Sequence, residues 1–144
     1  MTILIMTIRT VELVTYDRYL NDEYGLQEHL ASARAADQQE HQLRLSQFPY
    51  NVVLRLSYPE MDFANRWSWQ QFGPPDGECL DSYSEYPTCS EKTPHAHDGK
   101  WLSHWLAKTD YDFGYNEWCF EFKEDQQRFL EFVPFINFGE KFPK

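Results

Sequence analysis

Apolar and polar side chains alternate along residues 50–58, and this period of two predicts a β-strand. The apolar positions of one face are Val52, Leu54, Leu56 and Tyr58. Residues 2–15 are rich in β-branched side chains and favour either a strand or a mobile start of the chain. Residues 43–46 repeat the pattern of 54–57, so a hairpin turning near Pro49 is an alternative for this region.

A second alternating stretch, residues 117–122, predicts a strand with one buried face. Its aromatic side chains are Trp118, Phe120 and Phe122, and the opposite face carries Glu117, Cys119 and Glu121. Residues 101–107 predict the partner strand, because the connecting residues 108–114 include Asp110, Asp112 and Gly114, which favour turns. Together these residues predict an aromatic β-hairpin.

Three stretches show helical spacing instead. Residues 22–42 predict a helix capped by Asp22, with only a thin apolar stripe and a polar second half. Residues 63–72 predict a helix capped by Asp62 and closed by Gly73. After Phe122, apolar residues recur at helical spacing until Pro134, which ends the third helix.

From residue 50 onward, the expected order is strand, helix, strand, strand, helix and a final short strand at 134–138. This β-α-β-β-α-β order predicts a ferredoxin-like α+β domain over residues 48–144, with a four-stranded antiparallel sheet and two helices on one face. Residues 74–99 would form a long inserted loop. Residues 1–47 would form an N-terminal extension. Its polar helix would lie on the surface of the domain, be partly disordered, or pair with a second copy in a homo-oligomer.

Two runs of residues carry a resemblance to a known group of proteins. WCFEFKEDQQRFLEFV resembles the last β-α unit of small ferredoxin-like proteins common in phage genomes, and FANRWSWQQFGP resembles their first helix. The resemblance covers about residues 50–138 and includes no catalytic motif. It implies an accessory or host-directed factor, a class that includes inhibitors of host defence systems.

The composition points to a protein partner. The chain has a net charge of -10, so phosphate backbones and anionic membranes would repel it, and a partner with a basic surface is favoured. Its 144 residues suit one domain. We find no signal-peptide pattern and no run of transmembrane length, and three scattered cysteines do not suggest a disulfide framework. We therefore expect a cytoplasmic protein.

The inserted loop holds the residues with metal-binding chemistry. Two thiols and two imidazoles are a ligand set for tetrahedral zinc, and here they fall within 19 residues of sequence. They are Cys79, Cys89, His95 and His97. Their spacing differs from that of standard zinc fingers, so the alternative is a loop with free thiols and surface histidines. In an oxidising setting, Cys79 and Cys89 are also candidates for a disulfide.

Cys119 and His104 lie on adjacent predicted strands, near Asp110 and Asp112, and suggest a thiol–imidazole pair. No flanking signature accompanies them, and the chain has no phosphate-binding glycine loop or G-x-S-x-G motif. The more economical interpretation is a half-buried cysteine and a surface histidine. The sequence therefore predicts a protein that is not an enzyme.

Aromatic side chains in the predicted turn are candidates for partner binding, because a core role is less natural there. Acids lie around them and in the loop, where residues 73–99 hold six Asp or Glu against one Lys. The predicted contact residues are Tyr111, Phe113, Tyr115, Asp110, Asp112, Asp76, Glu78 and Asp81. The favoured function is an acidic binding factor that docks on a basic or nucleic-acid-binding surface of a host protein. The alternative is a structural or assembly protein with a zinc-stabilised loop.

Overall fold

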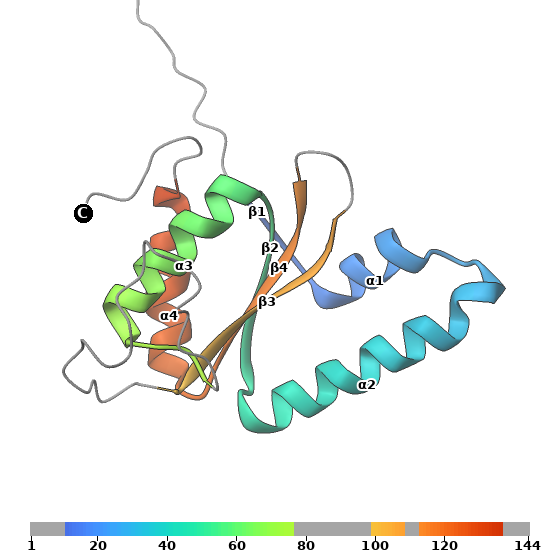
Figure 1. Ribbon diagram of the computed structural model, residues 1–144, viewed down its shortest axis with the longest axis horizontal. Coiled ribbons are helices and arrows are strands. Elements are labelled where there is room, and N and C mark those ends of the chain that lie inside the picture. Colours follow the sequence, from blue (N-terminus) through green and yellow to red (C-terminus); the bar gives the residue numbers. More distant parts are fainter. Residues whose placement is uncertain (1–10, 77–98, 109–112, 137–144) are drawn as a thin grey trace, which may run out of the picture.

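The computed structural model describes residues 11–76, 99–108 and 113–136 as three layers. A four-stranded sheet forms the middle layer, with α3 (Tyr58–Phe72) and α4 (Lys123–Phe132) on one face. On the other face lie α1 (Tyr16–Tyr24) and the longer α2 (Ala31–Gln47), as Figure 1 shows. The α+β class and the antiparallel sheet are confirmed.

The sheet has the strand order β1-β2-β4-β3, and every neighbouring pair is antiparallel. The strands are β1 (Glu12–Val14), β2 (Tyr50–Ser57), β3 (Trp101–Lys108) and β4 (Phe113–Phe120). Since β4 lies between β2 and β3 and runs antiparallel to both, β2 and β3 are parallel to each other. The run from β2 through α3, β3 and β4 to α4 therefore follows the expected order.

The ferredoxin-like order is not confirmed as a whole, because the fourth strand comes from the other end of the chain. Its place at the sheet edge beside β2 is taken by β1, in which Leu13 pairs with Leu54. The final strand expected at 134–138 is not seen in its described part, where η3 (Val133–Phe135) is a 3-10 helix. Pro134 lies in this turn, directly after the end of α4.

Helix α3 begins five residues earlier than its sequence suggested. Ser57, not Asp62, is the N-cap: its hydroxyl accepts a hydrogen bond from the backbone N–H of Glu60, whose carboxylate accepts one from the N–H of Ser57. This arrangement is a capping box. Pro59 is tolerated in the first turn, because backbone N–H groups there have no acceptor within the helix and a residue without an N–H loses no hydrogen bond. Asp62 instead pairs with Arg66 one turn later.

The face of the sheet covered by α3 and α4 is an aromatic core. Trp118 and Phe120 of β4 contact Phe129 of α4, with ring centroids 4.9 and 5.5 Å apart. Trp67 and Phe132 stack between the two helices at 4.1 Å. The indole N–H of Trp118 donates to the side chain of Asn65 at 3.0 Å. Apolar burial of this extent is the main stabilising contribution in a domain of this size.

The predicted helix 22–42 is wrong in its bounds, because the chain turns within it. Helix α1 ends at Gly25, which has φ 58° and ψ -148°, a conformation that only glycine adopts readily. The short 3-10 helix η1 (Glu28–Leu30) then leads directly into α2. Residues 12–47 thus form one strand of the sheet and a helical hairpin that covers its second face (Figure 1).

Candidate functional site

The second face of the sheet is bound to α2 by charged groups. Asp37, His41 and Arg44 recur at i, i+4 and i+7, a spacing that places them on one side of a helix, and this side faces α1 and the sheet. Among the described residues, neither apolar cluster of the core contains a residue of α2. The usual pattern of a covering helix, with apolar residues inside and charged residues outside, is therefore inverted.

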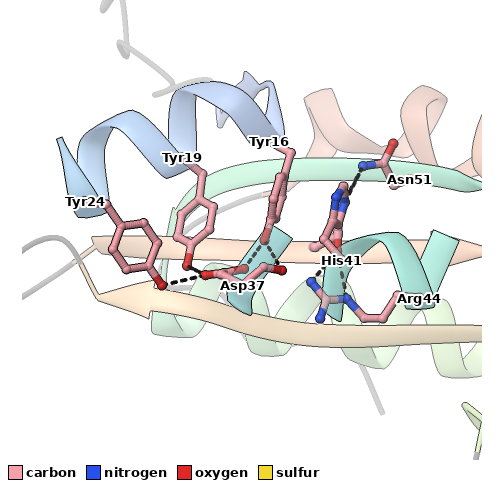
Figure 2. Close-up of polar contacts among 8 residues, drawn as sticks. Tyr16, Tyr19, Tyr24, Asp37, His41, Arg44 and Asn51 are labelled. Atoms are coloured by element: carbon pink, nitrogen blue, oxygen red, sulfur yellow. Dashed lines mark hydrogen bonds and ion pairs between the residues drawn. The ribbon is translucent and has the colours of Figure 1, made fainter. Parts of the chain in front are cut away.

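Asp37 is the first of two carboxylates around which the contacts gather (Figure 2). It accepts hydrogen bonds from three tyrosine hydroxyls of α1: Tyr16, Tyr19 at 2.6 Å and Tyr24 at 2.8 Å. The hydroxyl of Tyr16 also lies 3.2 Å from the backbone carbonyl of Asp37. One carboxylate thus joins α2 to the whole length of α1.

Glu117 of β4 is the second carboxylate, and its side chain is fully buried at 0% exposure. His41 Nε2 lies 2.6 Å from Glu117 Oε2, and the amide of Asn51 donates to the same oxygen at 2.9 Å. Arg44 Nε donates to Oε1 at 3.2 Å. The rings of His41 and Tyr16 stack at 3.5 Å, so the two carboxylate sites are in direct contact.

The environment shifts the acidity of both carboxylates downward. Burial alone would raise the pKa of Glu117, but the hydrogen bonds from His41 and Asn51, together with the charges of His41 and Arg44, lower it. Burial likewise opposes the ionisation of Asp37, but the three tyrosine hydroxyls and the charge of Arg44 lower its pKa. Both side chains are therefore anions at neutral pH. Burial and the bond to Asp37 raise the pKa of Tyr16 and Tyr19, so these residues are neutral donors.

Sequence reasoning missed this site because it placed Glu117 and Cys119 on a solvent-facing side of their strand. Both are buried, since the α1–α2 hairpin covers the second face of the sheet. The sequence did contain one indication of this covering hairpin. Tyr16, Tyr19 and Leu20 follow the N-cap Thr15 at helical spacing, which marks an apolar face on α1.

The suggested thiol–imidazole pair does not form across the strands. Leu102 is the register partner of Cys119, whereas His104 is opposite Glu117. Burial, and then the charge of Glu117, raise the pKa of the Cys119 thiol, which is the reverse of the shift that activates a nucleophile. Asp110 and Asp112, the acids of that hypothesis, lie outside the described residues. Cys119 is thus a protonated, buried thiol beneath α2.

The predicted partner-binding residues are only partly within the described chain. Asp76 is exposed, and Phe113 is half-buried with the guanidinium of Arg55 over its ring at 5.1 Å. Tyr115 is 1% exposed and packs edge-on against Tyr19, so it belongs to the core and not to an exposed turn. The remaining predicted contacts lie outside the described residues: Tyr111, Asp110, Asp112, Glu78 and Asp81.

The predicted zinc ligands, Cys79, Cys89, His95 and His97, also lie outside the described residues. Within the described part of the chain, no group of three or more His, Cys, Asp or Glu side chains is placed to hold a metal ion. The zinc prediction therefore stays a prediction.

A hollow of about 360 Å³ borders the outer part of β3 and the first turns of α3. Its walls include Tyr58, Asn65, Trp105 and Asn116. Asn116 is buried and donates to the hydroxyl of Ser103 at 2.8 Å. The lining also includes charged side chains, from Arg44, Asp62 and Asp76, so the hollow suits a polar ligand.

Comparison with known proteins finds no matching family model, curated protein or solved structure. No helix in the described residues has the length and apolar character needed to cross a membrane.

Proposed function

We propose that this protein is a non-enzymatic, acidic binding factor that docks on a basic surface of a protein partner in the cytoplasm. The resemblance noted above favours a phage-encoded accessory factor, of the kind that inhibits a host protein by covering its nucleic-acid-binding surface. The observation that carries the proposal is the tip of the α1–α2 hairpin, where the most exposed large apolar side chain of the described residues lies among acids.

That side chain is Leu26, which is 97% exposed. Isolated surface leucines are common, so its exposure alone would mean little. It lies, however, between the exposed acids Glu23 and Glu28, on a turn that Arg34 holds in place by donating to the carbonyl of Gly25 and to Asn21. An exposed apolar side chain with acids beside it, on a turn held by hydrogen bonds, supports contact with a basic partner surface.

The start of β4 adjoins this side of the hairpin. The hydroxyl of Tyr115 donates to Asp22 near the end of α1, and Tyr19 packs on the ring of Tyr115 at 5.5 Å. The proposed surface therefore combines the hairpin tip with Phe113 at the start of β4. Asp76 is left out of it, because its N–H donates to the carbonyl of Trp101 at the other end of the sheet. The other contacts predicted at 110–112 and in the acidic insertion lie outside the described residues. Tyr115 is left out of this surface because it is buried.

The test is a comparison of variants in capture from the natural host lysate. Leu26→Asp and the double change Glu23→Gln with Glu28→Gln should each remove the same partner, because they delete the anchor and the acidic rim separately. Capture by the full chain should also weaken as salt rises, since charge steers the encounter.

Leu43→Asp is the matched control, because Leu43 is 64% exposed on α2 and lies away from the tip. The Leu43→Asp variant should capture the same partner as the wild-type chain. The proposed surface would be contradicted if all these variants retained a specific partner equally. It would also be contradicted if binding of the partner did not depend on salt.

Leu43 also favours the alternative function, a structural or assembly protein. The outward side of α2 exposes Ala35, Ala36, Gln39 and Leu43, a stripe of small or uncharged side chains with one neighbouring charge, Glu40. Such a stripe suits contact with a second copy. Light scattering on the eluting protein decides this point: a dimer that Leu43→Asp converts to a monomer favours assembly, whereas a wild-type monomer favours the binding factor.

A further inference from the structure

The attachment of α2 differs from that of every other α-helix in the described chain. Of its 17 residues, one, His41, is buried, and none belongs to an apolar cluster. By contrast, α1 contributes Tyr16, Tyr19 and Leu20 to the cluster on the second face of the sheet. Apart from the bonds of Arg34 at the hairpin tip, what holds α2 is therefore a pair of carboxylates, the half-buried Asp37 and the buried Glu117.

Such an attachment depends on charge. A hydrogen bond to an ionised acceptor stabilises about twice as much as a neutral one, so neutralising both carboxylates removes much of what holds α2. The apolar contacts of α3 and α4 with the sheet do not depend on charge. The two sides of the sheet thus respond differently to the same chemical change.

We propose that α2 is a detachable strap: when Asp37 and Glu117 are neutralised, α2 separates from α1 and the sheet, while β2, β3, β4, α3 and α4 stay folded. Release uncovers the hydroxyls of Tyr16, Tyr19 and Tyr24 and the thiol of Cys119. The turn at Gly25 and the Phe48–Pro49 segment are the joints of this movement, since they bound the strap on either side. The bonds from Arg34 to Gly25 and Asn21, which hold the turn in the closed form, break in the same step.

The groups that face the two carboxylates come from four elements. They are Tyr16, Tyr19 and Tyr24 from α1, His41 and Arg44 from α2, His104 from β3, and Cys119 from β4. Both carboxyls have a lowered pKa in the folded chain, so their contribution is complete above an ordinary carboxyl pKa of about 4. It is lost as pH falls through the lower, folded-state pKa.

The reactivity of the Cys119 thiol measures how often α2 separates from the sheet. In the full chain carrying Cys79→Ser and Cys89→Ser, it is the one remaining thiol. At pH 7, the added double change Asp37→Asn with Glu117→Gln should raise its rate of reaction with 4,4′-dithiodipyridine at least about tenfold, the factor that 1.4 kcal/mol in the opening equilibrium produces. Glu40→Gln removes an exposed charge from the same helix and should leave the rate unchanged.

Hydrogen exchange followed by mass spectrometry separates release from global unfolding. The amides of residues 31–47 should exchange faster in the double variant, while those of 123–132 keep wild-type rates. Equal acceleration in both segments, or no change in either, would overturn the proposal.

If the double variant does not fold, the wild-type chain supplies the same test under acid. Between pH 7 and pH 3, exchange in residues 31–47, corrected for its intrinsic pH dependence, should rise before exchange in 123–132. A single common transition would exclude a separate strap. These measurements read the helix itself, so their outcome is independent of whether the hairpin tip binds a partner.

Discussion

The two faces of this sheet are held by different interactions. On the α3–α4 face, stacked aromatic rings such as Trp118 and Phe129 fill the interface. On the α1–α2 face, a smaller apolar cluster under α1 adjoins a polar one under α2. There the carboxylates of Glu117 and Asp37 have six hydrogen-bonding partners between them, and one of these, Arg44, also forms an ion pair with Glu117. Apolar contacts tolerate small displacements, whereas short, directional bonds fix one alignment of helix and sheet.

This difference bears on specificity. Buried ion pairs contribute little net stability compared with apolar residues of the same volume, because removing charges from water is costly. Their effect is to penalise every arrangement in which a charge is left without a partner. The second face therefore selects the position of α2, while the first face supplies most of the stabilisation of the domain.

The largest effect is expected on the aromatic face. Trp118→Ala deletes a fully buried side chain that contacts Phe129 and hydrogen-bonds Asn65, and should lower the free energy of unfolding by about 4 kcal/mol. Urea unfolding followed by circular dichroism measures this change. A loss below about 1 kcal/mol would mean that this face is not the main apolar core.

Glu117→Ala should cost about 3 kcal/mol, because it leaves the positive charge of Arg44 buried beside an empty space. Replacing the whole group, with Glu117→Leu, His41→Leu and Arg44→Met, should restore stability to within about 1 kcal/mol of the wild type. Urea unfolding of the single and triple variants checks both values. A triple variant less stable than the single one would show that the charges contribute net stability.

Acidification should weaken the polar face first, and by less than Glu117→Ala, because a protonated carboxyl keeps its volume and some hydrogen bonds. Since the pKa values of Asp37 and Glu117 are both lowered in the folded chain, stability should decline as pH falls below about 4. Urea midpoints measured from pH 7 to pH 3 give the slope. In the triple variant described above, the part of the slope due to Glu117 should vanish.

The smallest effects are expected for single tyrosine hydroxyls. Tyr19→Phe should cost about 1.5 kcal/mol, since it removes a bond to an ionised acceptor at a buried ring. Tyr24→Phe should cost about 0.5 kcal/mol, because this ring is half-buried and water replaces part of the lost bond. Equal losses for the two changes would indicate that burial does not distinguish these hydroxyls.

The sequence predicted the elements whose signals are local. Strand β2 matches the alternating run at 50–58 within one residue, and α4 ends where Pro134 indicated. The start of α3 was missed, although Ser57 and Glu60 have the capping-box spacing, because Asp62, five residues later, is also a favourable N-cap residue.

The candidate site could not be predicted from local sequence patterns. A glutamate within an alternating strand normally faces water, and Glu117 faces inward only because a helix from residues 31–47 covers it. The charged side of α2 resembled a solvated face, since its spacing alone does not say which way it points. The same limit explains why β1 was not recognised as the fourth strand: three residues carry too little pattern to show which edge they pair with.

The bond between Glu117 and His41 joins residues 76 positions apart along the chain. Pairing of β2 with β4 already places Glu117 opposite Val53, so the bond needs only the further step in which α2 closes over these strands. We therefore expect the bond to form after the transition state for folding. Removing Glu117 should therefore leave the folding rate nearly unchanged and accelerate unfolding. On this basis the polar face governs how long the native state persists once it is reached.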